Sequence, residues 1–159
     1  MVKKADTKDF DFFYELYMHP AINPYLLYEQ MSATEFGPVF ESLLQQEVLF
    51  VYYADGLPAG MFKLIAQKYR NAHICYLGGV AIVPAFSGKG EGGKMMNQII
   101  TLARESGFLR IELTVAIAND KAIQLYEKAG FQKEGVLKKY THLKSEHRYI
   151  DEIMMALIF

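Results

Sequence analysis

The chain has 159 residues, of which 52% are hydrophobic and 22% are charged, and its formal net charge is −1. Composition of this kind is typical of a globular chain that buries a core of its own, and it excludes a disordered or low-complexity chain. A net charge so close to zero also argues against a general attraction to nucleic acid.

Neither a membrane segment nor a signal peptide is visible in the sequence. No apolar run reaches the length that a membrane-spanning helix needs, and the start, MVKKADTKDF, lacks an apolar core. The single cysteine, Cys75, cannot form an internal disulfide and lies in an apolar run, where we expect a small buried side chain. We therefore expect one domain over residues 1–159 that acts in the cytoplasm, with neither membrane nor nucleic acid as a partner.

The first part of the chain predicts two helices followed by three strands. Aromatic residues at helical spacing indicate a helix over 9–18, and Ser32 with Glu35 forms a capping box for a second helix that ends near Gln45. Pro38 must kink this second helix or delay its start. Strands are expected at about 47–54, 58–68 and 72–83.

A glycine-rich loop separates this part from a second set of helices and strands. Apolar side chains at helical spacing from Met95 to Ala103 predict a central helix, and the alternation from Leu109 to Val115 predicts a strand. A further helix and two strands are expected at about 120–129, 131–136 and 147–158. Together the elements predict an α/β fold with a sheet of mixed direction and helices on both faces, and its exposed edges near the C-terminus favour a homodimer.

The glycine-rich segment, VAIVPAFSGKGEGGKMM, predicts a phosphate site between a strand and a helix. Amides in the first turn of a helix lack intrahelical partners and favour anions, and glycines allow a phosphate to approach them closely. A nucleotide-binding P-loop is disfavoured, because Met95 stands where magnesium needs a hydroxyl. A dinucleotide-binding G-x-G-x-x-G, formed by Gly88, Gly90 and Gly93, is an alternative, although such a loop usually stands at the start of its fold.

A third pattern in the same loop, together with the string NDKAIQLYEKAGF after it, resembles the GNAT superfamily of acyl-CoA-dependent N-acyltransferases. The string is similar to that family's N-x-x-A-I-x-L-Y-E-x-x-G-F signature, and the ending YIDEIMMAL resembles bacterial ribosomal-protein and small-amine acetyltransferases. One position departs from the family's [QR]-x-x-G-x-[GA] loop, because Ser87 stands in place of Gln or Arg. The resemblance implies a GNAT-like, mostly antiparallel sheet of six to seven strands.

The resemblance also implies an acetyl-CoA-dependent N-acetyltransferase that acetylates a primary amine, on a small molecule or a protein, by direct attack in a ternary complex. The pyrophosphate of coenzyme A is then expected over the glycine loop, and its pantetheine arm along the strand that ends at Val83. Lysines near the loop suit the phosphates of the coenzyme. The expected coenzyme contacts are Ile82, Val83, Ser87, Gly88, Lys89, Gly90, Gly92, Gly93, Lys94, Asn119, Tyr126 and Lys128.

Two residues are expected to perform proton transfers. The leaving thiolate needs a donor with a pKa near or above its own, and the resemblance assigns Tyr126, although an aromatic residue at this helical spacing also suits a core. For the base that deprotonates the amine we predict Glu112, and pairing of Glu112 with Arg110 is the alternative. Further candidates for the base are Asp151, Glu152, His142 and His147.

No metal is expected, because the four histidines are scattered without ligand spacing. A second candidate function is a non-catalytic module that binds acyl-CoA and reports its level or regulates a partner. The amine acceptor is left open, because the residues that would shape its pocket match no specific pattern.

Overall fold

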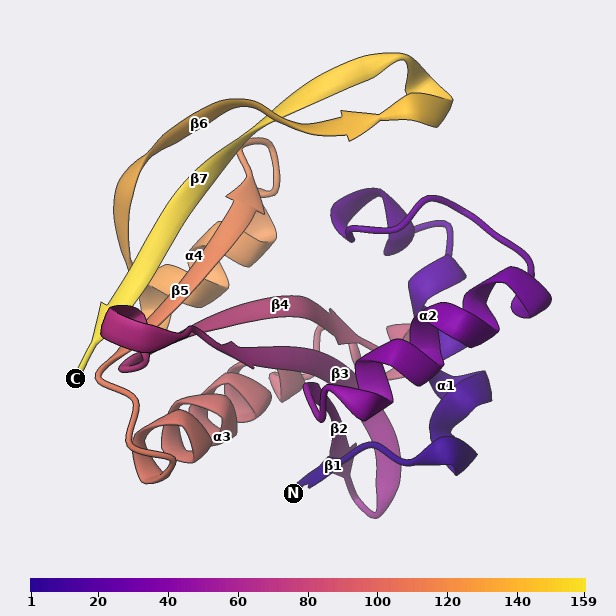
Figure 1. Cartoon of the computed structure of the whole chain (residues 1–159), viewed down its shortest axis with the longest axis horizontal. Coiled ribbons are helices and arrows are strands. Elements are labelled where there is room, and N and C mark those ends of the chain that lie inside the picture. The colour runs from indigo at the N-terminus through magenta and orange to yellow at the C-terminus, as the bar shows by residue number, and fades with distance from the viewer.

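The computed structural model describes all 159 residues and contains four α-helices and seven strands (Figure 1). The helices are α1 (Phe10–Met18), α2 (Ala33–Gln45), α3 (Glu91–Glu105) and α4 (Asp120–Lys128). The strands are β1 (Val2–Lys4), β2 (Leu49–Ala54), β3 (Leu57–Ala66), β4 (Ile74–Ile82), β5 (Arg110–Ala116), β6 (Gln132–Leu143) and β7 (Arg148–Ile158). None of the helices has the length and apolar character needed to cross a membrane. The cellular location stays a prediction.

All seven strands belong to one sheet, in the order β1-β2-β3-β4-β5-β7-β6. Every neighbouring pair is antiparallel except β4 and β5, which are parallel. This arrangement confirms the predicted sheet of mixed, mostly antiparallel direction. It is incompatible with the dinucleotide-binding alternative, whose sheet is mostly parallel.

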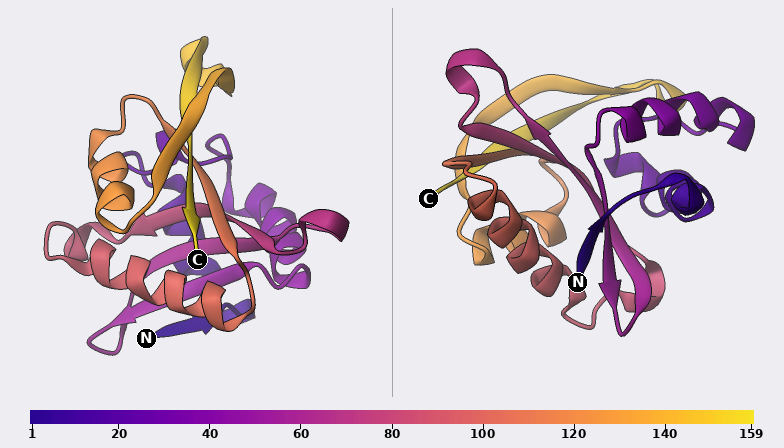
Figure 2. Two further views of the ribbon diagram at one scale, coloured as in Figure 1. Left: turned by 90° about the vertical axis from the view of Figure 1, so that its left-hand side faces the viewer. Right: turned by 60° about the horizontal axis from the view of Figure 1, so that its bottom comes forward.

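Helices cover both faces of the sheet, as predicted (Figure 2). On one face, α1 and α2 pack in a cluster that includes Phe13 and Phe36; on the other, α3 and α4 contribute Met96 and other apolar residues. We call these the α1 face and the α3 face. Alternation along β3 places Met61 in the first cluster and Phe62 in the second, so one strand supplies both cores.

Local sequence signals explain most element boundaries. Ser32 and Glu35 form the expected reciprocal capping box, so α2 begins at Ala33 and Pro38 lies inside it without delaying its start. The largest difference concerns β6, which we predicted to end near residue 136 and which continues to Leu143. Nearly all side chains of β6 are exposed, so no apolar alternation marks its second half.

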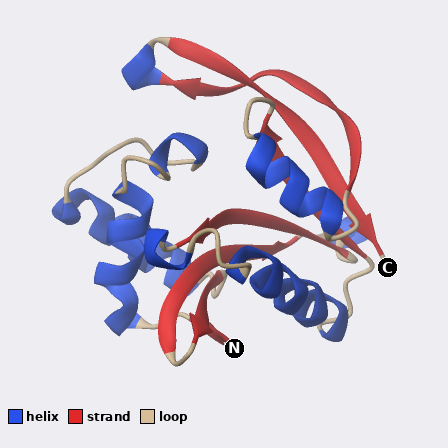
Figure 3. Cartoon of the chain, turned by 180° about the vertical axis from the view of Figure 1, so that it is seen from behind, coloured by secondary structure: helices blue, strands red, loops and turns tan.

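The strands β4 and β5 separate soon after they meet. They pair only where Ile74–Tyr76 faces Arg110–Glu112, and both strands then continue without pairing to each other (Figure 3). On its other side, β4 pairs with β3 through a register shift between Met61 and Lys63. The result is an opening between two neighbouring strands in the middle of the sheet, and the candidate site lies there.

Candidate active site

The loop before α3 leaves a run of backbone amides without partners. Gly88 and Gly90 have φ angles of 77° and 80°, and Gly90 is the N-cap of α3. The N–H groups of residues 88–93 donate no hydrogen bond within the protein; the next amide, that of Lys94, donates to the Gly90 carbonyl oxygen at 3.2 Å. A Cβ at Gly88, Gly90 or Gly93 would meet no atom within 4 Å. Unpaired amides that face open space at a helix N-terminus favour an anion such as a phosphate.

Two lysines at this loop are held by neighbouring side chains. Lys94 Nζ donates to Glu91 Oε1 at 2.7 Å, and the hydroxyl of Tyr52 donates to Glu91 Oε2 at 2.6 Å. Burial, together with the nearby Glu91 carboxylate, raises the pKa of Tyr52 to about 12. Lys121 Nζ, from α4, donates to Ser87 Oγ at 2.9 Å. Lys121 therefore brings a cation to the position where the loop has serine in place of the longer Gln or Arg.

A cavity of about 610 Å³ lies in front of these amides, and we call it the loop cavity. It is bounded by the loop, the end of β4 and α4, and Lys121 is among its lining residues. Of the predicted coenzyme contacts, those that line it are Ile82, Ser87, Gly88, Gly90, Gly92, Gly93, Asn119, Tyr126 and Lys128. Val83, Lys89 and Lys94 do not line it.

A second cavity, of about 440 Å³, lies in the opening between β4 and β5, and we call it the sheet cavity. Its walls include residues 77–80 of β4 and 114–116 of β5. The residues that line both cavities are Tyr25, Leu26, Val80, Asn119, Ala122 and Tyr126. The two cavities therefore adjoin, and a molecule bound in the first can extend toward the second.

The sheet cavity is lined from both faces of the sheet. Tyr126 comes from α4 and packs in the core of the α3 face. Thr114 lies on the opposite face of β5, because its neighbours Leu113 and Val115 belong to the α3-face core. By the same alternation, Glu152 precedes Ile153 of that core and faces the other way. The opening thus joins the α3 face, where Tyr126 packs, to a second compartment on the α1 face.

Tyr126 lies where the two cavities meet. Its side chain is 7% exposed, its ring packs 5.8 Å from that of Phe131, and its hydroxyl makes no hydrogen bond within the protein. Burial, with a smaller contribution from Tyr76, raises the pKa of Tyr126 above its ordinary value. The phenol therefore stays protonated at neutral pH and is available as a proton donor in the cleft.

Asn119 lies at the same junction and caps α4. Its side-chain oxygen accepts a hydrogen bond from the Ala122 amide at 3.3 Å, which fixes the start of the helix that carries Tyr126. Asn119 also lines both cavities. The residue that caps α4 therefore also lies beside the cleft.

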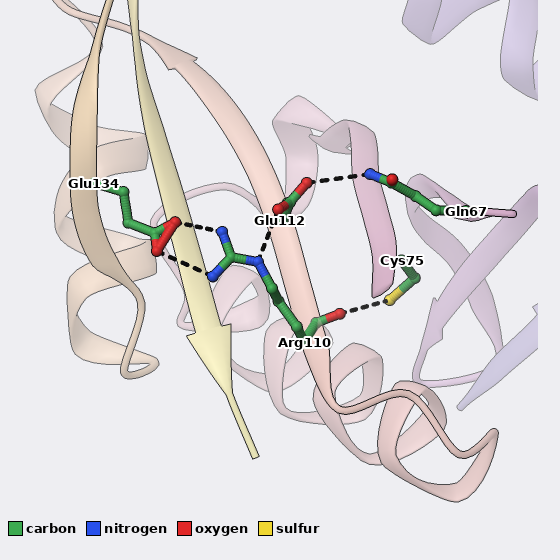
Figure 4. A network of polar contacts seen from close by, with 5 residues as sticks. All are labelled: Gln67, Cys75, Arg110, Glu112 and Glu134. Atoms are coloured by element: carbon green, nitrogen blue, oxygen red, sulfur yellow. Dashed lines mark hydrogen bonds and ion pairs between the residues drawn. The ribbon is translucent and has the colours of Figure 1, made fainter. Parts of the chain in front are cut away.

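Glu112 lies outside both cavities and is bound by protein groups (Figure 4). Arg110 Nε donates to Glu112 Oε1 at 2.7 Å, and Gln67 donates to its other oxygen at 3.2 Å. The same Arg110 forms an ion pair with Glu134 of β6. This is the pairing with Arg110 that the sequence left as the alternative, and the geometry does not bring Glu112 to the cleft as a base.

Glu152 on β7 is the carboxylate that does line the sheet cavity. The hydroxyl of Thr141 donates to Glu152 Oε1 at 2.8 Å. Tyr76 and Thr114, whose hydroxyl oxygens lie 3.0 Å apart, line the same cavity. Burial raises the pKa of Tyr76, so it too stays protonated. Asp151, another candidate for the base, accepts hydrogen bonds from Lys138 Nζ and from the backbone amide of Lys139.

Sequence patterns missed several of these side chains. Tyr76 and Thr114 are ordinary strand residues by composition, and only the separation of β4 from β5 makes them cleft residues. Lys63, which also lines the sheet cavity, carried a signal that was overlooked: it is a single charge within the apolar run GMFKLIA. The structure brings together no group of three or more His, Cys, Asp or Glu side chains that could hold a metal ion.

Known proteins share this fold over its full length. The spermidine N-acetyltransferase of Vibrio cholerae, solved in complex with CoA and spermine, matches with a TM-score of 0.86, 24% identity, and coverage of 99% of this chain and 94% of that one. The ribosomal-protein-alanine N-acetyltransferase of Brucella melitensis matches with a TM-score of 0.82 and 18% identity, over 100% and 99% of the two chains.

Sequence comparison points in the same direction. The L-amino acid N-acetyltransferase AaaT of Escherichia coli is 26% identical, over 99% of this chain and 97% of that protein. The spermidine N(1)-acetyltransferase of the same organism is 25% identical, over 92% and 80%. The model of the Acetyltransferase (GNAT) family matches residues 10–131. That match covers most of the chain, and it includes the glycine loop, the opened strands and Tyr126, so the chain belongs to the Acetyltransferase (GNAT) family.

Proposed function

We propose that this N-acetyltransferase transfers an acetyl group from acetyl-CoA to a primary amine by direct attack within a ternary complex. The observation that carries the proposal is the junction of the two cavities. An anion site with free amides lies at one end, a compartment with a carboxylate lies at the other, and Tyr126 stands between them.

The residues present fit coenzyme A. The free amides of residues 88–93 suit a pyrophosphate, because each donates toward an anion without giving up an internal partner. Lys121 and Lys128 add positive charge to the wall of the same cavity. The opening between β4 and β5 suits an extended arm, because strand edges that do not pair with each other leave main-chain groups for a ligand.

When bound, acetyl-CoA supplies an acyl group activated as a thioester. Attack by the amine then requires one group that takes a proton from the ammonium and one that gives a proton to the departing thiolate. We assign the donor role to Tyr126, whose side chain lines both cavities. We assign the acceptor role to Glu152 in place of Glu112, because Glu152 lines the sheet cavity and Glu112 is engaged by Arg110.

The first test is a calorimetric titration with acetyl-CoA, beside ATP and NAD, followed by an assay of thiol release with a panel of primary amines. We expect binding of acetyl-CoA alone and turnover with at least one class of amine. Binding without turnover across the whole panel would support the non-catalytic acyl-CoA module instead. Preference for ATP or NAD would mean that the loop does not serve coenzyme A.

We also propose a homodimer formed through the outer strand of the sheet. The strand β6 has one unpaired edge, and Val136 and Tyr140 on it are about half exposed, at 48% and 55%. Sedimentation of the purified protein tests this point, because a monomer at all concentrations would contradict it.

A further inference from the structure

A buried lysine in the sheet cavity has no ionic partner. Lys63 on β3 is 6% exposed, and its ammonium makes no hydrogen bond and no ion pair. The contact recorded for Lys63 Nζ is with the face of the Tyr28 ring, 5.4 Å from its centroid. Burial lowers the pKa of Lys63 below its ordinary value. A buried ammonium without a carboxylate is costly, so its presence calls for an explanation.

The surroundings of Lys63 keep it in contact with the cavity. Met61 and Lys63 point to the same side of β3, the α1 face. Gly78 of β4 pairs with Lys63, and Gly79 follows it at the register shift. A Cβ at Gly79 would lie 3.0 Å from Tyr17 Oη and 3.4 Å from Lys63 Cε. Of the side-chain polar atoms that are fully buried, Tyr17 Oη is the one without a hydrogen-bond partner. Lys63 Nζ also has no partner but is not fully buried, so it retains some access to solvent. That access leads through the sheet cavity, which Lys63 lines.

The sheet cavity contains two side chains of opposite charge type. Among the 18 residues that line it, Lys63 is the only basic residue and Glu152 is the only acidic one. They are not bonded to each other: Glu152 accepts from Thr141, and Lys63 has no partner. The remaining wall includes apolar side chains such as Leu26 and Leu77. The cavity therefore offers one basic and one acidic position in a wall of mixed polar and apolar side chains.

We propose that the acceptor is a small zwitterion, a primary amine that also carries a carboxylate, with its ammonium group at Glu152 and its carboxylate at Lys63. The inference rests on the proposed acetyl transfer and specifies its acceptor. A carboxylate at Lys63 forms the charge-assisted hydrogen bond that the folded protein alone leaves unmade. It also removes the cost of the buried, unpaired charge once substrate is bound.

The same pair of charges disfavours a polyamine. A second ammonium group would enter a cavity that holds a single carboxylate and an uncompensated lysine, and like charges in a shielded site repel strongly. An amine without a carboxylate would leave Lys63 unpaired and buried beneath it. The relatives named above include both an L-amino acid acetyltransferase and spermidine acetyltransferases, so the charge of this chain's own cavity decides between the two classes.

The test compares kcat/KM for L-amino acids, their carboxamides and spermidine, with acetyl-CoA saturating, in the wild type and in Lys63→Met. The wild type should prefer the amino acid. In Lys63→Met the ratio of amino acid to carboxamide should fall about tenfold to a hundredfold, because only the acid loses a charge-assisted bond. Taking the ratio between the two enzymes cancels the different basicity of the two amines. Lys68→Met, at an exposed lysine outside both cavities, is the matched control and should leave the ratio unchanged.

Stability separates a binding role from a structural one. Removal of an unpaired buried charge should leave the melting temperature equal or higher, so activity and stability should change in opposite directions. Equal wild-type rates with acid and carboxamide, or preference for spermidine, would overturn the zwitterion while leaving acetyl transfer intact. Failure of every amine would overturn acetyl transfer itself, and the inference with it. Should Lys63→Met not fold, Lys63→Gln and the wild-type panel decide the matter.

Discussion

The hydroxyl of Tyr126 has no partner within the protein, so its removal tests the proposed chemistry with little effect on stability. In Tyr126→Phe the ring still packs against Phe131. We expect turnover to fall by about two orders of magnitude, because the thiolate must then leave without a positioned acid, while affinity for acetyl-CoA changes little. Steady-state kinetics and calorimetry measure the two effects. Tyr69→Phe, at a side chain that is 92% exposed, is the control, and unaltered turnover in Tyr126→Phe would remove this residue from the mechanism.

Two carboxylates compete for the role of base, and a matched pair of variants decides between them. We expect Glu152→Gln to lower turnover near pH 7 by about 10²- to 10⁴-fold and to lose the acidic limb of the pH-rate profile. Its rate should recover as the pH approaches the ordinary amine pKa of about 10, because the acceptor then arrives already deprotonated. Glu112→Gln should keep the wild-type profile and instead lose about 1–2 kcal/mol of stability, since Arg110 loses one of its partners. The opposite result would return the base to Glu112.

Residues differ in how far the sequence alone could reveal them. Asn119 and Tyr126 lie within one contiguous string that resembles the family signature, at the N-cap and inside a single short helix, so the resemblance indicated them where their spacing alone did not. Glu152 could be named only among several candidates, because its closeness to Tyr76 depends on where β7 lies in the sheet. Lys63 was not foreseen as a site residue. A single charge within an apolar run is a signal of burial, but the sequence does not show whether such a side chain reaches a cavity or finds a partner.

At the scale of elements, the sequence predicts where α3 begins but does not predict where β6 ends. The glycines before α3 favour a left-handed turn and unpaired amides by chain chemistry alone, so this loop geometry was predictable. The second half of β6 has exposed side chains, and pairing with β7 holds it in the sheet. A second register shift in this pair, between Leu137 and Thr141, accompanies the placement of Thr141 beside Glu152. Such a bulge has no local signature in this sequence.

At the scale of the whole molecule, the two halves of the sheet are connected by only a short pairing between β4 and β5. Three residue pairs, from Ile74 with Arg110 to Tyr76 with Glu112, connect β4 to β5, and beyond them the strands separate. Burial alternates regularly along β5, but along β4 the alternation is interrupted at residues 78–80, where Gly79 has a φ angle of 59°. The glycine pair marks an irregular strand, but the separation from β5 also depends on how seven strands twist together, so the local pattern alone does not predict the opening. The proposed function nevertheless requires it, since the opening is where the loop cavity meets the sheet cavity.

A ligand that lies in this opening should stabilise both halves of the sheet at once. At a hundredfold excess over its Kd, acetyl-CoA should add about 2.7 kcal/mol to the free energy of unfolding, a rise of roughly 5–10 °C in melting temperature for a chain of this size. ATP at the same concentration should have no such effect. Hydrogen exchange should slow in residues 77–82 of β4 and 113–116 of β5 together with the loop at 88–93, because an arm between the strands contacts both edges. Protection confined to the loop would show that only the phosphates are held, and it would remove the reason for placing the thioester beside Tyr126.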